Sequence, residues 1–240
     1  MKELFISFPL SKKCLALTTT TALGNMAYQV DDGKDVKEHR ALLAESLNIP
    51  LNKFTYVHQS HSDVIKKVTI DDIGKGQNAF EDGLECDALY TSIKGVPLGI
   101  FHADCVPIFF VNESANIVGI IHAGFKGTMK HVTYKVIKEV LATENLDIKD
   151  FKFYIGPYRE PISFEIDSNN KTTITEAGFE SAIKDKRFDN GLANIIDLHE
   201  LGVKDKQIKA CHFDTVTDDR FYSAYQKTPV GRLVSLIYLK

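Results

Sequence analysis

Cysteine is scarce in this sequence, which has four in 240 residues. Cys14, Cys86, Cys105 and Cys211 lie far apart, and no two of them form a C-x-x-C pair. A disulfide scaffold is short and rich in cysteine, so this chain does not belong to that class. We therefore expect free thiols and a cytoplasmic location.

Excess positive charge is also missing, because 29 Lys and Arg stand against 32 Asp and Glu, a formal net charge of −3. A general nucleic-acid binder needs basic residues to neutralise phosphates, so we expect no nucleic-acid partner. No apolar run reaches the ~18 residues of a membrane span, which predicts no membrane partner. Glu3, Lys12 and Lys13 interrupt the apolar N-terminus, so we also expect no signal peptide.

Repeats, low-complexity tracts and linkers are absent too, so residues 1–240 are predicted to form a single domain. Short runs rich in apolar and β-branched residues predict strands at 3–8, 14–21, 54–59, 63–68, 87–92, 97–103, 106–112, 116–123, 151–157, 207–213 and 232–239. Apolar residues at helical spacing predict helices at 34–49, 127–146, 170–185 and 192–203. This mixture predicts an α/β or α+β domain with helices outside sheet layers.

Two local details belong to this prediction. The strands at 54–59 and 63–68 are expected to pair around the corner at Gln59–Ser62, and Thr128 is expected to cap the helix that follows it.

Three metal-ligand residues follow apolar strand-like runs. His61, Cys105 and His122 each precede a turn, and residues at strand ends can meet in one cleft. Two imidazoles and one thiolate suit Zn²⁺, and three protein ligands leave the fourth position open, as in catalytic sites. The spacings of 44 and 17 residues match no short metal motif. The alternative is that Cys105 is a buried small hydrophobe and the histidines are ordinary hydrogen-bonded residues.

Asp104 stands beside Cys105 and has two interpretations. It is a candidate general base or a carboxylate that orients a ligand histidine. It is equally a turn aspartate that bonds nearby backbone N–H groups. His58 and His102 are further candidates for metal ligands. His58 would point to the face of its strand opposite His61, so both are not expected to bind one ion.

At these residues the sequence resembles the YfiH-like family, also called laccase-domain or multicopper polyphenol oxidoreductase proteins. The family motifs HQ-x-H-G, A-D-C-x-P and H-A-G-W-R-G correspond to 58–62, 103–107 and 122–127. D-A followed by a threonine corresponds to Asp87-Ala88 and Thr91, and I-G-P to 155–157, followed by S-Y-E-V at 163–166. A late cysteine, F-F-S and G-R correspond to Cys211, 221–223 and 231–232. The matches run in order from about residue 18 to 240.

The resemblance implies a four-layer α/β/β/α fold with mixed sheets, and one zinc ion per chain bound by His61, Cys105 and His122. It also implies a purine nucleoside phosphorylase, which splits adenosine, inosine, guanosine or methylthioadenosine with phosphate and in some members deaminates adenosine. Purine nucleoside and phosphate are then the expected partners, for a monomer or small homo-oligomer. Older family labels imply a copper polyphenol oxidase, and others a role in editing cell-wall precursors.

The chain departs from the family pattern at several flanking positions. Trp-Arg after the glycine is Phe125-Lys126, and a cysteine after Gly-Pro is Tyr158. The late Ser-Tyr-Arg-Arg is Ser223-Ala224-Tyr225-Gln226, so two arginines are missing. All three proposed metal ligands are present.

Phosphorolysis needs cations to hold phosphate while the base departs. Lys126 and Arg40 are the candidates, with Arg232 behind them, and the helix that opens at Gly124–Gly127 is a further candidate for anion binding. Gln59 is a candidate contact for purine or ribose, or else closes its turn.

Three other functions stay open. A Cys–His hydrolase or amidase would use Cys105 as nucleophile and His122 as base. A copper oxidase would need several ions, and the 8 histidines include no H-x-H pair. A non-catalytic zinc-binding module would keep the metal without turnover.

Overall fold

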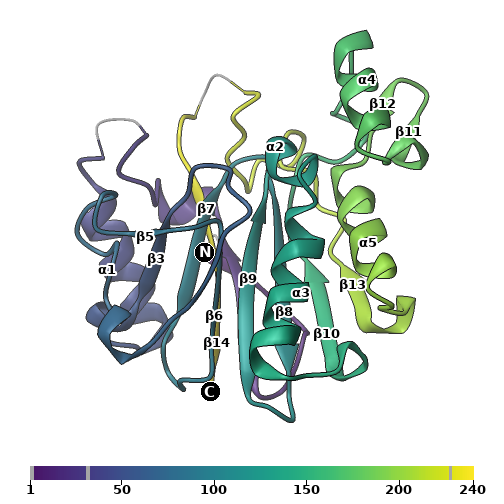
Figure 1. The fold of residues 1–240 in the computed structure, drawn as a ribbon. Helices are drawn as coiled ribbons and strands as arrows, with labels where there is room; N and C mark the ends of the chain where they lie inside the picture. Colours follow the sequence, from purple (N-terminus) through teal and green to yellow (C-terminus); the bar gives the residue numbers. More distant parts are fainter. Residues whose placement is uncertain (1–2, 31–32, 227–228) are drawn as a thin grey trace.

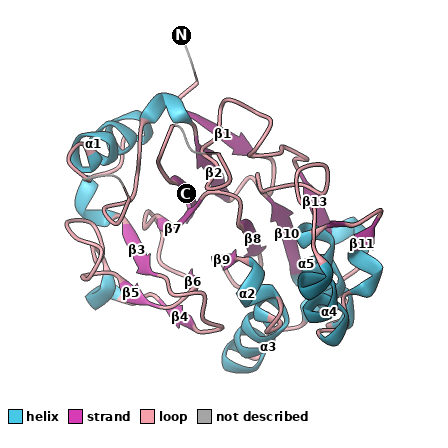
Figure 2. Ribbon diagram, turned by 90° about the horizontal axis from the view of Figure 1, so that it is seen from above, coloured by secondary structure: helices cyan, strands magenta, loops and turns pink. Residues whose placement is uncertain are grey.

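The computed structural model describes residues 3–30, 33–226 and 229–240. Two six-stranded sheets pack against each other, and helices lie on the outer side of each, as Figures 1 and 2 show. The predicted four-layer α/β/β/α fold with mixed sheets is confirmed. Among the described residues, no helix is both long and apolar enough to span a membrane.

The strands divide between the two sheets in an order unlike their order along the chain. The first sheet contains β1 (Phe5–Phe8), β2 (Cys14–Thr19), β3 (Thr55–His58), β5 (Leu84–Glu85), β7 (Leu98–His102) and β14 (Leu233–Leu239). The second contains β4 (Ile65–Lys67), β6 (Ala88–Thr91), β8 (Val106–Asn112), β9 (Ile117–Ala123), β10 (Phe151–Ile155) and β13 (Ile208–Ala210). Their orders are β1-β2-β14-β7-β3-β5 and β13-β10-β8-β9-β6-β4, and each has parallel and antiparallel pairs.

Strand β8 lies in the middle of the second sheet, and all its residues are buried. Phe109 packs in the core between the sheets, whereas Phe110 packs in the core beneath the helices. A strand covered on both faces requires such a continuous apolar run. On the neighbouring strand β9, the same alternation puts His122 on the face where Ile120 joins the core between the sheets.

The helices cover the two outer faces. They are α1 (Val36–Leu47) on the first sheet and α3 (Val132–Glu144) and α5 (Asn190–Glu200) on the second, with a single turn, α2 (Phe125–Thr128), ahead of α3. Short 3₁₀ turns lie at Thr21–Leu23, Leu51–Lys53, Ile70–Asp72, Ile148–Asp150, Glu180–Ala182 and Asp205–Gln207. The predicted helices at 34–49 and 192–203 are confirmed.

The predicted cap at Thr128 was wrong. Thr128 ends α2, and α3 begins only after His131, whose φ of 59° is left-handed. Continuing a right-handed helix through that residue is not possible, so the predicted helix is split in two.

The prediction of one helix over 170–185 was only partly right. Helix α4 (Ser168–Glu176) ends just before Gly178, whose φ is 81°. The chain then enters a hairpin of β11 (Ile183–Lys184) and β12 (Arg187–Phe188). These elements enclose a small core of their own around Phe179 and Phe188, and Figure 1 shows them projecting beyond the second sheet.

The chain crosses from the first sheet to the second at three places: between β3 and β4, between β5 and β6, and between β7 and β8. Strands β3 and β4 therefore belong to different sheets, and the predicted pairing around Gln59–Ser62 was wrong. Instead, each strand pairs with a parallel neighbour in its own sheet, β3 with β7 and β4 with β6. All three crossings bear on the functional site.

Candidate functional site

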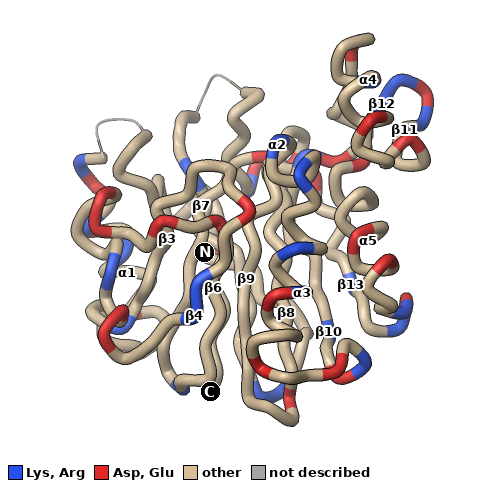
Figure 3. Tube along the Cα trace, viewed as in Figure 1, with Lys and Arg blue, Asp and Glu red and all other residues tan. Residues whose placement is uncertain are grey.

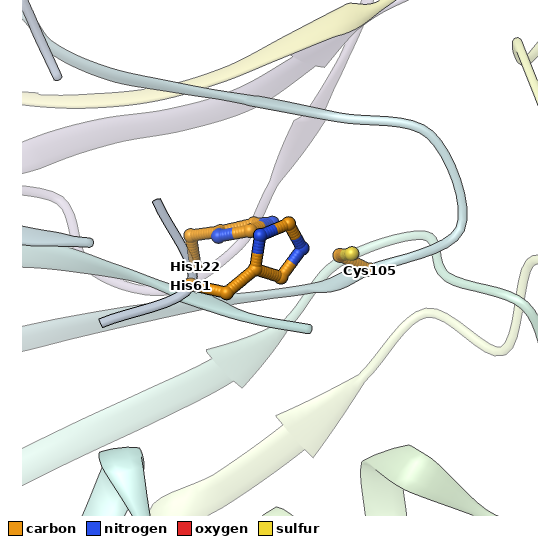
Figure 4. Close-up of side chains that lie close together, drawn as sticks. All are labelled: His61, Cys105 and His122. Carbon is orange, nitrogen blue, oxygen red and sulfur yellow. The ribbon is translucent and has the colours of Figure 1, made fainter. Parts of the chain in front are cut away.

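His61, Cys105 and His122 meet at the end of the layer between the two sheets. His61 lies on the crossing from β3 to β4, Cys105 on the crossing from β7 to β8, and His122 near the end of β9. One donor atom from each residue lies within 4.8 Å of the other two. Figure 4 shows both imidazole rings beside the Cys105 sulfur. The sequence prediction that these three residues converge agrees with this geometry.

Left-handed backbone conformations shape the two crossings. His61 has a φ of 61° and Asp104 a φ of 83°. Such values are uncommon for residues other than glycine, and they turn the chain sharply. The turn at Asp104 breaks the strand alternation, so Cys105 reaches the same site as His122 instead of following the pattern of β7.

Gly124 provides the space in which the ligands meet. A Cβ atom at this position would lie 2.7 Å from His61 Cδ2, and 3.0 Å from both His61 Nε2 and Cys105 Sγ. The His61 and Cys105 donor atoms are therefore packed against the same backbone position. The sequence motif contained this glycine, but only the fold shows that its missing side chain admits the ligands.

Asp87 lies on the third crossing, between β5 and β6, and orients two of the three residues. It is fully buried, and its carboxylate accepts a hydrogen bond from Nδ1 of buried His122 at 2.8 Å. This hydrogen bond places the proton on Nδ1 and leaves the lone pair of Nε2 free to bind a metal ion. The carboxylate also accepts hydrogen bonds from the backbone N–H groups of Ser60, His61 and Ser62. In the sequence, a motif match is the one signal at Asp87, and it does not indicate this role.

The electrostatics of the centre favour a thiolate. Burial acts to raise the pKa of Cys105, but His122 and His61 lower it to about 6. Burial acts to lower the pKa of His122, but the Cys105 charge and the Asp87 hydrogen bond raise it to about 9. A deprotonated thiol beside two imidazoles is a donor set that suits zinc.

The carboxylate that orients a ligand histidine is Asp87, whereas this role was predicted for Asp104. The Asp104 carboxylate accepts hydrogen bonds from Thr215 Oγ1 at 2.7 Å and from the backbone N–H of Tyr225 at 3.0 Å. It therefore bonds the loops around the site rather than a ligand histidine. This geometry favours the alternative of a turn aspartate.

Arg40 does not reach the metal centre. It is 1% exposed, and its guanidinium donates to the backbone carbonyls of Met26, Gly76 and Gln77. Its guanidinium carbon lies 4.4 Å from the centroid of the Tyr56 ring. Through these contacts Arg40 holds the chain beneath α1. The prediction that Arg40 binds phosphate is therefore not supported.

The other predicted substrate residues have different surroundings. The Gln59 amide donates to the Phe101 carbonyl at 2.5 Å and accepts from the Phe101 N–H at 2.9 Å, so it fastens the crossing to β7. Lys126 lies exposed on α2, two residues after Gly124. Because α2 has four residues, no long helix directs its dipole at this turn, and the expected anion site on that dipole is not supported.

The remaining histidine candidates lie outside the trio. His58 packs its ring against Phe80, with centroids 4.1 Å apart, and His102 bonds Ser235 Oγ at 2.8 Å. Another His and carboxylate group in the described part of the chain joins His131 to Asp197 at 2.7 Å. The Asp197 carboxylate also accepts the N–H of Tyr134, so it braces the first turn of α3.

Comparison with known proteins identifies the family of the chain. The family model described as multi-copper polyphenol oxidoreductase laccase matches residues 17–240. The chain belongs to this family. It is 26% identical to purine nucleoside phosphorylase YlmD of Bacillus subtilis, with 100% of the chain and 90% of that protein covered. It is 31% identical to a purine nucleoside phosphorylase of Staphylococcus epidermidis, with 89% and 83% covered.

Two solved structures have the same fold as this chain. Protein YfiH of Bacillus licheniformis superposes with a TM-score of 0.91 at 26% identity, covering 98% of this chain and 96% of that one. YlmD of Geobacillus stearothermophilus superposes with a TM-score of 0.90 at 27% identity, covering 100% and 97%. The predicted resemblance to the YfiH-like family is confirmed.

Proposed function

We propose that this protein is a zinc-dependent purine nucleoside phosphorylase. The supporting observation is the convergence of His61, Cys105 and His122 into one centre, in a chain whose relatives bear the name purine nucleoside phosphorylase. In the proposed reaction the bond between C1′ of the ribose and the purine nitrogen breaks. A bond from a phosphate oxygen to C1′ forms, and the free base and ribose 1-phosphate are released.

The three side chains suit one zinc ion better than a copper cluster. Two imidazole nitrogens and one thiolate make three ligands, which is the number found in catalytic zinc sites. Among the described residues, no other group of potential ligands contains cysteine. A bound zinc ion would supply a Lewis acid with one open position. Asp87 fixes the tautomer of His122, and Gly124 keeps the space around the donors clear.

Lys126 is the cation nearest in sequence to this centre, two residues beyond Gly124 and four beyond His122. In the proposal its exposed ammonium attracts phosphate to the mouth of the site. Deamination of adenosine is proposed as a secondary activity of the same centre, since both reactions bind a purine nucleoside beside the metal.

The test combines metal analysis with product analysis on purified wild type and Cys105→Ala. We expect about one zinc per wild-type chain, as three-ligand catalytic sites hold, and little in the variant. Adenosine, inosine and guanosine are each incubated with and without phosphate, and free base and deaminated nucleoside are separated by chromatography. Base release that requires both phosphate and Cys105 supports the proposal. Several copper ions per chain with oxidation of a phenol would contradict it.

A Cys–His hydrolase is the second candidate, because His122 lies beside Cys105 and lowers the pKa of its thiol. It predicts hydrolysis that survives complete removal of metal by a chelator and stops on alkylation of Cys105. The phosphorylase predicts the opposite, since chelation removes the ion and zinc restores turnover.

A further inference from the structure

Arg159 lies in an unusual position beside the proposed site. It follows β10 by four residues, and its guanidinium carbon lies 4.5 Å from the ring centroid of Phe164 and 4.1 Å from that of Tyr225. Nε and Nη2 both donate to the carbonyl of Ser163, at 2.8 and 2.5 Å. Two aromatic faces and one carbonyl thus fix the plane and the orientation of the guanidinium.

The rest of the guanidinium is unpaired within the described part of the chain. Nη1 has no hydrogen-bond partner there, and no described carboxylate lies within ion-pair distance. Arg159 lines a cavity of about 700 Å³ together with Tyr225. Two further cations, Lys171 and Lys186, and two carboxylates, Glu165 and Asp167, lie on its walls, so the lining keeps one positive charge in excess. Figure 3 shows the basic residues of the turn between β11 and β12, where Lys186 lies. A fixed guanidinium with a free edge is suited to bind phosphate through two N–H groups.

Asp104 connects this arrangement to the metal centre. Its carbonyl accepts the N–H of Arg159 at 3.0 Å, and its carboxylate accepts the N–H of Tyr225 at 3.0 Å. Asp104 directly precedes the ligand Cys105. Both residues of the stack are therefore anchored to the crossing that carries a metal ligand.

The chain departs from the family motif at Tyr225, the residue that stacks on Arg159. The family motif has Arg-Arg where this chain has Tyr225-Gln226. Tyr225 covers the Arg159 guanidinium, and the Gln226 amide donates to the carbonyl of Val216 in its own loop. An arginine at 225 would bring a second positive charge close to Arg159, and the two would repel. Tyrosine at 225 therefore accommodates a guanidinium that comes from position 159.

We propose that Arg159 binds the phosphate substrate. This proposal rests on the proposed phosphorylase function and identifies the residue that holds its second substrate. The ligand is the phosphate dianion, bound at the Nη1 edge of Arg159 in the cavity that Arg159 and Tyr225 line.

The test compares Arg159→Gln with wild type and with Lys138→Gln. Glutamine keeps an N–H donor for the Ser163 carbonyl but carries no charge, and Lys138 is an exposed cation on α3 that controls for net charge. The KM for inorganic phosphate should rise about 10- to 100-fold in Arg159→Gln, because a hydrogen-bonded charge contributes roughly 1.5–3 kcal/mol. The KM for the nucleoside and the zinc content should stay at wild-type values.

A second measurement separates this inference from the proposed function. Phosphate is titrated against the thermal unfolding temperature of the zinc-loaded proteins, without nucleoside. Stabilisation by phosphate in wild type that is lost in Arg159→Gln but kept in Lys138→Gln supports the Arg159 site, even if no nucleoside is turned over. Equal phosphate KM and equal stabilisation in wild type and Arg159→Gln would overturn the Arg159 site and leave the phosphorylase intact. Equal losses in both charge variants would overturn it as well.

Discussion

The carboxylate of Asp87 accepts a hydrogen bond from Nδ1 of His122 at 2.8 Å and another from the backbone N–H of His61 at 3.1 Å. One buried carboxylate therefore holds two of the three proposed metal ligands, one by its side chain and the other by its backbone. Burial opposes its ionisation, yet the hydrogen bonds from His122 and Ser62 keep the pKa of Asp87 below its ordinary value. The ionised form is the one that can serve both ligands.

Replacing Asp87 by Asn should weaken metal binding about 10- to 100-fold, the usual effect of losing the carboxylate behind a ligand histidine. Asparagine has one acceptor oxygen and no charge, so it cannot hold both His122 and the His61 segment. Competition with a zinc-binding dye measures the affinity. Asp104→Asn is the matched control, because its carboxylate bonds Thr215 and Tyr225 instead of a ligand. Equal affinities in the two variants would contradict the role given to Asp87.

Gly124→Ala should displace the ligands and abolish stoichiometric zinc binding. The added methyl would lie 2.7 Å from His61 Cδ2 and 3.0 Å from Cys105 Sγ, closer than side chains pack. Gly127→Ala, on the short helix that Gly124 precedes, is the control, since the nearest neighbour of the added methyl would be Val132 Cγ1 at 3.4 Å. Metal content after gel filtration checks both. Full zinc occupancy in Gly124→Ala would show that the donors do not meet where the structure has them.

Arg40→Ala should lower the free energy of unfolding by about 3 kcal/mol or more, because several buried carbonyls lose a charged hydrogen-bond donor. The guanidinium serves Met26, Gly76 and Gln77, so the loss is structural. Zinc affinity per folded chain should not change. Urea unfolding measures the loss against Lys37→Ala on the exposed face of α1. A raised phosphate KM with unchanged stability would restore Arg40 as a substrate residue.

Stability should fall in acid partly because of His102. Burial, with the nearby charges of His122 and Arg232, lowers the pKa of His102 to about 3, whereas the unfolded chain has an ordinary value near 6.5. Between these values the unfolded state binds the extra proton, so His102 stabilises the fold above about pH 6.5 and loses that contribution as pH falls toward 3. The slope is at most about 1.4 kcal/mol per pH unit.

His102→Gln should flatten this dependence while keeping a polar group near Ser235, its partner at 2.8 Å. Unfolding free energies of metal-free protein at several pH values give the slope directly. Ser235→Ala is the matched control, because it removes the same hydrogen bond without removing a titratable group. Parallel curves for wild type and His102→Gln would refute the assignment.

Much of the architecture follows from local pattern in the sequence. Continuous apolar runs such as 106–112 identify strands that are covered on both faces, and apolar spacing over 34–49 identifies α1. The motifs around His61, Cys105 and His122 singled out these residues before any geometry was known. These features depend on residues near one another in the chain, and local sequence determines them directly.

Only the tertiary structure decided how those pieces are used. Strands β3 and β4 belong to different sheets because β3 pairs with β7 and β4 with β6, and both are pairings between segments distant in the chain. The role of Asp87 and the burial of Arg40 depend on partners from distant parts of the chain, His122 for one and Gly76 for the other. The stack of Arg159 on Tyr225 joins residues 66 positions apart. The sequence by itself determined which side chains are capable of the chemistry, and packing between distant segments decided which of them meet.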